Sequence, residues 1–180
     1  MYPKIITKKN RDLTKTEKAT INKNRVKEFG EAEAKDFNRD YEPNTEWFFV
    51  EANGEIVSLG GLRPINLTHM GKTYDILGIC SIISVVKGRR YGTALMAGIL
   101  SRAKKKGKTA LGFTRQTEFF KKAGLGTEKD FIKRFIYKNP ETGEEVVDED
   151  VDGIYFNGED DFINKVLETD SPVYINVLHW

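Results

Sequence analysis

The chain has 180 residues, 39% of them apolar, and its 29 basic residues nearly balance 27 acidic ones, giving a net charge of +2. These values exclude a disordered chain, which combines low hydrophobicity with high net charge, and favour a single domain over residues 1–180. One cysteine excludes an internal disulfide framework. The longest nearly apolar stretch, residues 76–86, is too short for a membrane span, which takes about 20 residues. We therefore expect a soluble, cytoplasmic protein.

The first third of the chain predicts one strand and two helices. Residues 4–7 are apolar enough for a short strand. Thr14 or Thr16 is expected to cap a helix that runs to about Phe29, and Glu17 completes a capping-box pattern with Thr14. Residues 31–40 predict a second, exposed helix.

The strongest hairpin signal in the sequence is the Asn53-Gly54 pair between two β-rich segments, residues 47–51 and 55–62. Residues 66–72 are expected to connect this hairpin to a further strand, residues 74–86. The middle of that strand is nearly all apolar, so we expect it to be buried on both faces at the centre of a sheet.

Glycines mark the ends of the helices predicted beyond this strand. Apolar residues recur at helical spacing between residues 92 and 106, and Gly107 follows them. Gly124 ends a second helix at residues 117–123. The remaining pattern predicts strands at 109–113, 131–137, 153–156 and 173–178, an acidic loop between the second and third of these, and a short helix at 159–167.

The near-neutral total conceals two segregated charge runs. Residues 87–108 carry eight basic residues and no acid, and residues 141–161 carry ten acids and no base. Such runs are often solvated faces, but they also suit an anionic ligand at the first and a cationic one at the second. A nucleic-acid partner is disfavoured, because the chain is not basic overall and Tyr91 is the one aromatic residue in the basic run.

The most informative segment is the predicted strand, turn and helix around residues 82–96. Its turn reads Arg89-Arg90-Tyr91-Gly92-Thr93-Ala94, and the helix starts at once. Helix N-termini expose unpaired backbone N–H groups and a partial positive charge, so they bind phosphates. Glycine at position 92 lets a phosphate approach the backbone. The segment therefore predicts a phosphate-binding turn, whereas an ordinary strand–helix turn with solvated arginines is the alternative.

These residues resemble the Arg/Gln-x-x-Gly-x-Gly/Ala signature of the GNAT acetyltransferase superfamily, which also lies between a buried strand and a helix. Residues 117–125, TEFFKKAGL, resemble the second signature of that family. The resemblance implies an α+β fold of the GNAT type, with a mixed, mostly antiparallel central sheet and helices on both faces.

The resemblance also implies an acetyl-CoA site, with acetyl-CoA as co-substrate. By analogy, backbone amides from Arg90 to Leu95, through Tyr91, Gly92, Thr93 and Ala94, would hold the pyrophosphate with help from Arg89. The backbone of Ile83, Ser84 and Val85 would pair with the pantetheine arm as an added strand. One amide there would stabilise the oxyanion of the tetrahedral intermediate.

The sequence departs from the family where proton transfer is concerned. Many members carry a carboxylate on the central strand, and here residues 78–85 contain none. The usual general-acid tyrosine is replaced by Phe120. Among the substitutes, we name Ser81, Ser84 and the chain terminus at Trp180 as catalytic candidates. Cys80 is expected to be a buried small residue rather than a nucleophile, and two histidines with one cysteine argue against a metal site.

The acceptor is expected to be a cationic small-molecule or peptide amine. The acidic loop with Asp150 and Asp152, together with the terminal Trp180, is similar to the layout of aminoglycoside 2′-N-acetyltransferases, so these three residues are predicted to bind substrate. The predicted activity is N-acetylation of a primary amine by direct attack in a ternary complex. Aminoglycoside 2′-N-acetylation and a catalytically silent acyl-CoA-binding module are the alternatives, and a homodimer is left open.

Overall fold

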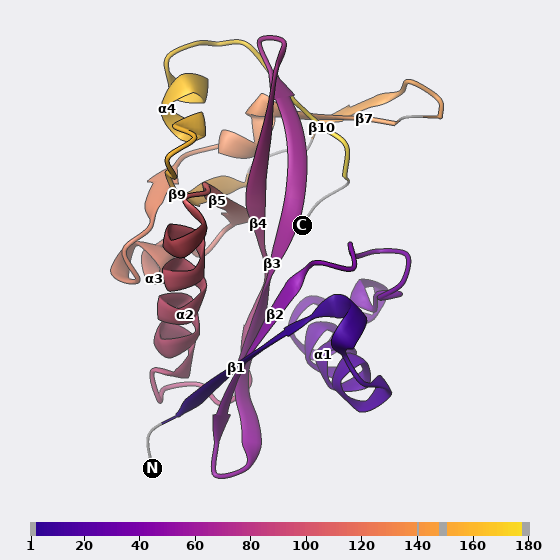
Figure 1. Ribbon diagram of the computed structural model, residues 1–180, viewed down its shortest axis with the longest axis vertical. Coiled ribbons are helices and arrows are strands. Elements are labelled where there is room, and N and C mark those ends of the chain that lie inside the picture. Colours follow the sequence, from indigo (N-terminus) through magenta and orange to yellow (C-terminus); the bar gives the residue numbers. More distant parts are fainter. Residues whose placement is uncertain (1–2, 140, 148–150, 178–180) are drawn as a thin grey trace. The chain divides into compact units, whose positions relative to one another are not determined.

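The computed structural model describes residues 3–139, 141–147 and 151–177 (Figure 1). The chain divides into two compact units, which we call unit 1 (Met1–Arg63 with Cys80–Ile99) and unit 2 (Pro64–Ile79 with Leu100–Trp180). The expectation of one domain over 1–180 stays a prediction. The architecture is α+β with a mixed, mostly antiparallel sheet, which confirms the predicted fold class.

Unit 1 contains β1 (Lys4–Lys9), α1 (Lys15–Phe29), β2 (Glu46–Ala52), the start of β3 (Glu55–His69), the end of β4 (Lys72–Ser84) and the start of α2 (Tyr91–Lys106). β1 pairs antiparallel with β2, and β2 pairs antiparallel with β3. Asn53 and Gly54 have φ values of 53° and 81°. Two successive positive φ values are what a two-residue hairpin turn requires, so the predicted hairpin is confirmed.

Helices cover both faces of the sheet in unit 1, α2 on one side and α1 on the other (Figure 1). Gly60 permits the close approach of α2, because a Cβ at this position would lie 3.3 Å from Leu95 Cδ2, and it would also lie 2.5 Å from Ile82 Cδ1 of β4. On the opposite face, Trp47 is fully buried and packs edge-on against Tyr41, with ring centroids 5.1 Å apart.

Unit 2 contains β5 (Ala110–Thr114), α3 (Thr117–Lys122), β6 (Gly126–Glu128), β7 (Phe135–Lys138), β8 (Glu145–Val147), β9 (Asp152–Phe156), α4 (Phe162–Leu167) and β10 (Val173–Ile175). The strand order is β6-β9-β5-β4-β3-β10-β7-β8. β4 runs parallel to β5 and β10 runs parallel to β7, whereas β5–β9, β6–β9, β3–β10 and β7–β8 are antiparallel.

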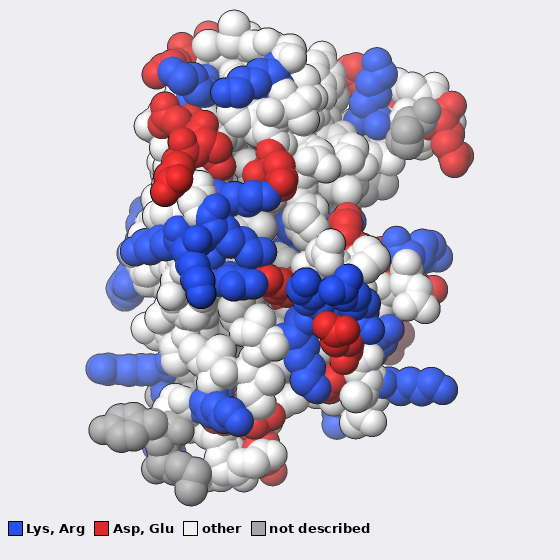
Figure 2. Space-filling view, in the orientation of Figure 1, with Lys and Arg blue, Asp and Glu red and all other residues white. Residues whose placement is uncertain are grey.

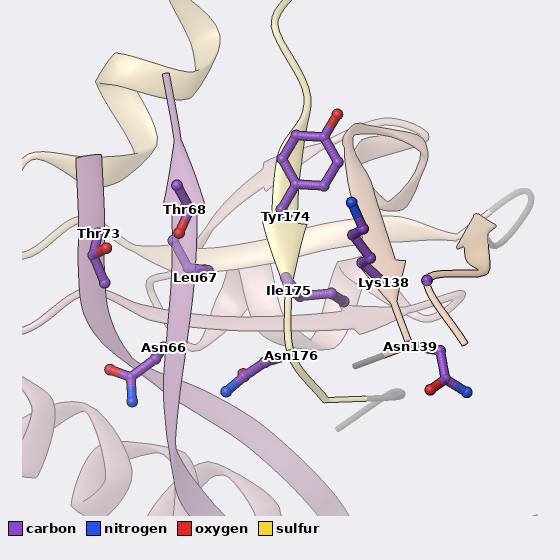
Figure 3. Close-up of a pocket in the computed structure, with 10 residues that line it drawn as sticks. Asn66, Leu67, Thr68, Thr73, Lys138, Asn139, Tyr174, Ile175 and Asn176 are labelled. Carbon is purple, nitrogen blue, oxygen red and sulfur yellow. The ribbon is translucent and has the colours of Figure 1, made fainter. Parts of the chain in front are cut away.

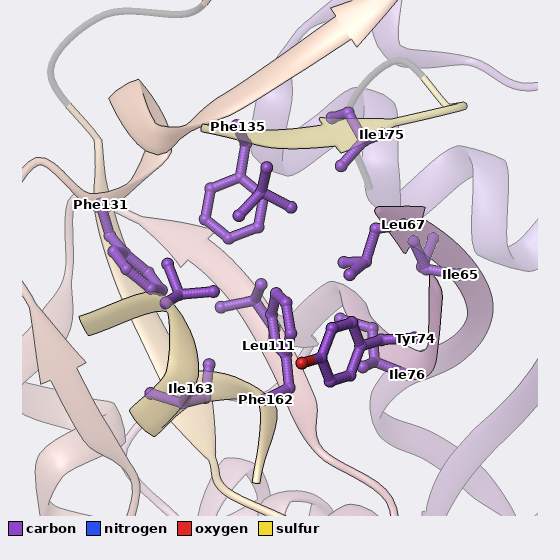
Figure 4. Packing of buried hydrophobic residues seen from close by; sticks show 12 residues of the cluster. Ile65, Leu67, Tyr74, Ile76, Leu111, Phe131, Phe135, Phe162, Ile163 and Ile175 are labelled. Atoms are coloured by element: carbon purple, nitrogen blue, oxygen red, sulfur yellow. The ribbon is translucent and has the colours of Figure 1, made fainter. Parts of the chain in front are cut away.

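The core of unit 2 is aromatic and aliphatic (Figure 4). Phe162 of α4 is fully buried, and its ring lies 5.0 Å from the ring of Tyr74, measured between centroids. Phe135 contacts Phe131 edge-on at 5.2 Å. Because Leu67 and Ile175 also join this cluster, one face of the β3–β10–β7 region is anchored in the core and the other is turned away from it.

Several predicted elements differ from the structure in type or extent, and the segment expected to be an acidic loop contains strand β8. Residues 31–40 form a 3-10 turn at Glu31–Glu33 followed by turns, not a helix. The reason is that side chains bind the backbone there: Asn22 bonds both the N–H and the C=O of Lys35, and Asp36 accepts from the N–H of Asn38. Residues 131–134 form a 3-10 helix before β7, and β3 extends through the expected connection to His69.

The predicted capping box at the start of α1 is confirmed. Thr14 Oγ1 accepts from the Glu17 N–H at 3.2 Å, and Glu17 Oε2 accepts from the Thr14 N–H at 2.8 Å. These bonds satisfy two backbone donors that would otherwise lack partners.

We expect Thr14→Ala to lower the free energy of unfolding by about 1 kcal/mol, because the cap is lost. Thr16→Ala, within the first turn of the same helix, is the matched control and should leave stability nearly unchanged. Urea denaturation of both variants measures this, and equal stabilities would contradict a functional cap at Thr14.

Candidate functional site

The end of β4 in unit 1 is fixed by hydrogen bonds to β3. Ser58 Oγ donates to the carbonyl of Ile83 at 2.8 Å, and the Val86 N–H donates to the carbonyl of Val57 at 3.1 Å. Ile83 is buried, whereas Ser84 is half-buried. The strand therefore keeps a defined path up to the turn that follows it.

Pairing between β4 and β5 is short. It covers two residue pairs, Leu77 with Ala110 and Gly78 with Leu111. Residues 83–85, the predicted partners of a pantetheine arm, lie farther along β4 than these pairs. Backbone N–H and C=O groups beyond a paired segment can bind an extended ligand as an added strand.

The turn after β4 leads directly into α2. Gly88 and Arg90 have φ values of 76° and 59°, in the left-handed region. The Ala94 N–H donates to the carbonyl of Arg90 at 3.1 Å, so the hydrogen bonding of the helix begins there. The amides of residues 91–93 precede this bond and lack partners within the helix. Among the amides predicted to bind phosphate, those of residues 91–93 therefore have no partner within the helix, whereas the Ala94 amide is already bonded.

Two arginines accompany these amides. Arg89 and Arg90 are both exposed, and neither forms an ion pair with any described residue. Their neighbour Lys87 is engaged, with its Nζ 3.2 Å from Glu28 Oε1. Two free guanidinium groups beside a helix N-terminus can bind an anion through charge and hydrogen bonds together.

Ser81, within β4, has a φ of 55°. A left-handed residue inside a strand is a feature of β-bulges, and for a residue with a Cβ it costs roughly 1–2 kcal/mol. Ser81 Oγ accepts a hydrogen bond from Arg25 Nη1. Backbone strain of this kind is concentrated at functional sites, where the surrounding structure maintains it.

Arg25 reaches Ser81 from α1, where Ile21 and Arg25 are the buried residues. The guanidinium donates from Nε to the carbonyl of Glu33 at 2.9 Å and from Nη2 to Glu33 Oε2 at 2.8 Å. The buried cation is thereby paired and its hydrogen bonds are largely satisfied. Its remaining nitrogen, Nη1, determines the position of the Ser81 hydroxyl.

A second buried arginine, Arg63, pairs with a partly exposed glutamate in the same unit. Arg63 binds Glu42 in a bidentate manner, Nε to Oε2 at 2.7 Å and Nη2 to Oε1 at 2.9 Å. The Arg63 guanidinium also lies 5.7 Å from the centroid of the Tyr41 ring. We call Arg25, Glu33, Tyr41, Glu42, Arg63, Cys80 and Ser81 the polar cluster of unit 1.

The two weak acids of the polar cluster are neutral at physiological pH. Burial raises the pKa of Tyr41 to about 12, against the opposing effect of Arg25. Burial raises the pKa of the Cys80 thiol to about 11, although Arg63 and Arg25 favour its thiolate. A thiol that stays protonated is a poor nucleophile, which agrees with the expected structural role of Cys80.

The predicted catalytic and substrate residues are not all brought together. Ser81 belongs to the polar cluster, whereas Ser84 Oγ donates to the carbonyl of Val86 at 3.1 Å. Asp152 Oδ1 accepts from the Asp130 N–H at 2.9 Å, so one of its carboxylate oxygens is bound within unit 2. Asp150 and Trp180 lie outside the described residues.

Arg25, Tyr41 and the Arg63–Glu42 pair were not predicted from the sequence to belong to the site. One signal was present: Arg25 follows Ile21 by four residues, on the stripe of α1 that is buried. A charge on the apolar stripe of a helix indicates a buried partner. Tyr41 and Glu42 lie in an irregular segment, where periodicity carries no information.

The rest of the basic run lies elsewhere on α2. Lys and Arg side chains gather over the C-terminal part of this helix (Figure 2). Several of them already have partners: Lys104 Nζ lies 5.8 Å from the Phe156 ring centroid, and Lys108 pairs with Asp75. Cations at a helix C-terminus are also favoured by its dipole. We assign this part of the run to stability rather than to ligand binding.

No group of three or more His, Cys, Asp or Glu side chains within the described ranges is arranged to hold a metal ion. None of the helices in those same ranges is both long enough and apolar enough to cross a bilayer.

The raised pKa values predict a loss of stability at alkaline pH. The pKa of Cys80 is 9.0 in the unfolded reference and about 11 in the fold, so its contribution is complete below pH 9.0 and disappears as the pH rises toward 11. We expect urea denaturation to show falling stability across this interval. Cys80→Ala should show a shallower fall, and identical pH slopes for both proteins would contradict this assignment.

The strain and the hydroxyl of Ser81 can be separated by two substitutions. Ser81→Ala should lower the free energy of unfolding by about 1–3 kcal/mol, because Arg25 loses a buried acceptor. Ser81→Gly removes the same hydroxyl but relieves the left-handed backbone, so we expect it to be less destabilising than alanine by about 1 kcal/mol. A larger loss for glycine than for alanine in chemical denaturation would show that the backbone at Ser81 is not strained.

A known protein family matches the part of the chain that contains these residues. The sequence model of the acetyltransferase (GNAT) family matches residues 13–125, which include the polar cluster, the end of β4 and α2. No curated protein matches the chain by sequence.

Several solved structures share the fold. ElaA from Escherichia coli has 13% identity and a TM-score of 0.58, over 86% of this chain and 99% of that one. A Bacillus subtilis acetyltransferase in complex with CoA has 17% identity and a TM-score of 0.54, over 86% and 98%. A GNAT family acetyltransferase from Elizabethkingia anophelis with acetyl-CoA bound has 17% identity and a TM-score of 0.53, over 86% and 97%. At these identities the likeness establishes the fold.

Proposed function

Because the chain belongs to the GNAT acetyltransferase family, we propose that it transfers an acetyl group from acetyl-CoA to a primary amine. The observation that carries this proposal is the continuous path from the end of β4, through an exposed arginine turn, to the free amides that open α2. This segment supplies both an edge for an extended ligand and a site for its phosphates.

In this proposal the diphosphate of acetyl-CoA binds the amides of residues 91–93, and Arg89 and Arg90 supply charge. Gly92 is itself buried, and because it has no Cβ, its own side chain does not obstruct a phosphate that approaches the neighbouring amides. The backbone of residues 83–85 pairs with the pantetheine arm. The relatives from B. subtilis and E. anophelis, which bind CoA and acetyl-CoA, support the choice of ligand.

The proposed reaction is a direct attack in a ternary complex. The lone pair of the neutral amine forms a bond to the thioester carbonyl carbon, the oxygen becomes an oxyanion, and a backbone amide of β4 stabilises it. The intermediate then collapses, the carbon–sulfur bond breaks, and CoA leaves as a thiolate while the nitrogen loses a proton. An alkylamine with a pKa near 10.4 is about 0.04% neutral at pH 7, so deprotonation costs roughly 4–5 kcal/mol.

The described part of the chain has few side chains near the proposed site that could accept or donate a proton during the reaction. Residues 78–85 of β4 contain no carboxylate. Ser81 is the proposed substitute, because its hydroxyl is oriented by Arg25. The catalytic proposals for Ser84 and for the terminus at Trp180 remain. Phe120 is buried and supplies no acid to the leaving thiolate.

The proposed acceptor is a cationic small molecule or peptide amine in the cytoplasm. The subfamily alternative, an aminoglycoside 2′-N-acetyltransferase, rests on Asp150, Asp152 and Trp180. Of these, Asp152 is the described one, and its Oδ1 already accepts from the Asp130 N–H. We therefore keep the acceptor class at the level of an amine.

One observation favours a second function, a catalytically silent module that binds acyl-CoA. The tyrosine that would protonate the leaving thiolate is replaced by Phe120, and the Ser84 hydroxyl already donates to the carbonyl of Val86. The cofactor-binding turn does not depend on any of them. Binding and turnover therefore have to be measured separately.

Replacing Arg89 and Arg90 together by alanine tests the binding site. We expect the affinity for CoA, measured by isothermal titration calorimetry, to fall by at least about tenfold, because two charge-assisted contacts to phosphate are lost. Lys105→Ala removes an exposed charge at the other end of α2 and is the matched control. Equal CoA affinity in the double variant and the control would contradict the assigned site.

Turnover distinguishes the two functions. Acetyl-CoA is incubated with polyamines, aminoglycosides and lysine-containing peptides, and released thiol is measured. The enzyme proposal predicts thiol release that depends on the amine and is reduced in the Arg89/Arg90 variant. Tight CoA binding without release on any acceptor would overturn the enzyme proposal in favour of the silent module.

A further inference from the structure

Unit 2 carries a surface cavity of about 360 Å³ that the proposed function does not use. It lies on β3, the start of β4, β10 and the β7–β8 hairpin (Figure 3). The side chains that project into it are polar: Asn66, Thr68, Thr73, Lys138, Asn139, Tyr174 and Asn176.

The strand register explains why these side chains share one face. Tyr174 lies opposite Thr68 on β3 and beside Ile136 on β7. Side chains alternate along a strand, so residues two positions farther on return to the same face. Continuing the register therefore aligns Asn66, Asn176 and Lys138 in a second row, and Figure 3 shows Asn66 and Asn176 beside one another. We call these two rows the polar platform.

The opposite face of the polar platform packs against the core of unit 2, which fixes its backbone. The alternate residues, Leu67 and Ile175, are buried in the core of unit 2, as is Phe135. A surface whose backbone is fixed in a sheet loses little conformational entropy when a ligand binds. Strands lie about 4.8 Å apart and same-face residues about 7 Å apart, so the platform matches one or two sugar rings in size.

Most of its polar groups are unused. Within the described parts of the chain, the side chains of Asn66, Thr68, Asn176, Lys138 and Tyr174 form no hydrogen bond or ion pair. An exception is Asn139, whose Oδ1 accepts from the backbone of the hairpin turn. The free groups include two carboxamides, each of which can donate and accept at once.

This chemistry selects a neutral ligand rich in hydroxyl groups. Carboxamides can bind two adjacent hydroxyls, and the exposed ring of Tyr174 offers a flat apolar surface to the C–H face of a sugar ring. The acids of the hairpin, Glu141, Glu144 and Glu145, disfavour a polyanion such as a nucleic acid. Glu145 also lies opposite Lys138 in the register, which offsets its charge.

We propose that the polar platform is a carbohydrate-binding site, with Tyr174 stacking on a pyranose ring and Asn66 and Asn176 binding its hydroxyl groups. The proposal goes beyond the acetyl transfer proposed above. It requires neither CoA binding nor turnover, and so either proposal can fail while the other stands.

Saturation-transfer NMR on the full chain, without CoA, tests the site with glucose, galactose, mannose, N-acetylglucosamine and cellobiose as probes. We expect saturable binding of at least one sugar, with transfer strongest at its ring protons. Tyr174→Ala and Asn66→Ala should each weaken that binding by about tenfold, because each removes a contact at an exposed position without touching the core.

Asn44→Ala, at an exposed asparagine of unit 1, is the matched control and should bind the sugar as the wild type does. Circular dichroism of each variant verifies that the fold is kept. Absence of saturable binding for every probe would overturn the proposal, and so would equal affinities in Tyr174→Ala, Asn66→Ala and the control.

Discussion

The left-handed backbone of Ser81, which we call the bend of β4, is the constraint on which the site in unit 1 depends. A buried strand that continued in regular geometry would keep its backbone groups committed to the sheet, whereas a left-handed residue reorients them locally. Such a conformation persists only where its surroundings fix it. Here a buried guanidinium, itself bound to Glu33, fixes the Ser81 hydroxyl from α1. The N-terminal helix thus contributes to the shape of the central strand.

The same strand connects this bend to the proposed phosphate site. From Ser81 the chain passes through Ile83, which is bonded to Ser58, and reaches the turn before α2 within a few residues. The free amides of α2 are therefore held at a fixed distance along the chain from the bend. In the proposed complex, this short segment would therefore bind both the phosphates and the thioester of acetyl-CoA.

Local signals in the sequence were sufficient to predict the turn and the helix ends that lie near the site. The Asn53-Gly54 turn, the capping box at Thr14 and the glycine after α2 each act over a few residues, and each is found in the structure. Residues 31–40 were predicted wrongly, because side chains bind their backbone: Asn22 of α1 binds Lys35, and Asp36 binds Asn38.

The polar cluster could not be predicted from the sequence, because its members are far apart along the chain. Arg25 and Ser81 are 56 residues apart, and Arg63 and Glu42 are 21 apart, so only the fold brings them together. The left-handed backbone of Ser81 has no local signal either, since nothing in its side chain requires it. The motif at residues 89–94 could be proposed from the sequence because its residues are contiguous, and the structure places α2 from Tyr91 onward, as expected of a helix that starts within this motif.

The most direct test of the central claim is the pattern of backbone amide chemical shifts when CoA is added to the labelled protein. The account predicts large shifts at residues 91–93, at Arg89 and Arg90, and at residues 83–85, with little change at the lysines that close α2. Shifts confined to those lysines or to unit 2, with the turn after β4 unaffected, would contradict it.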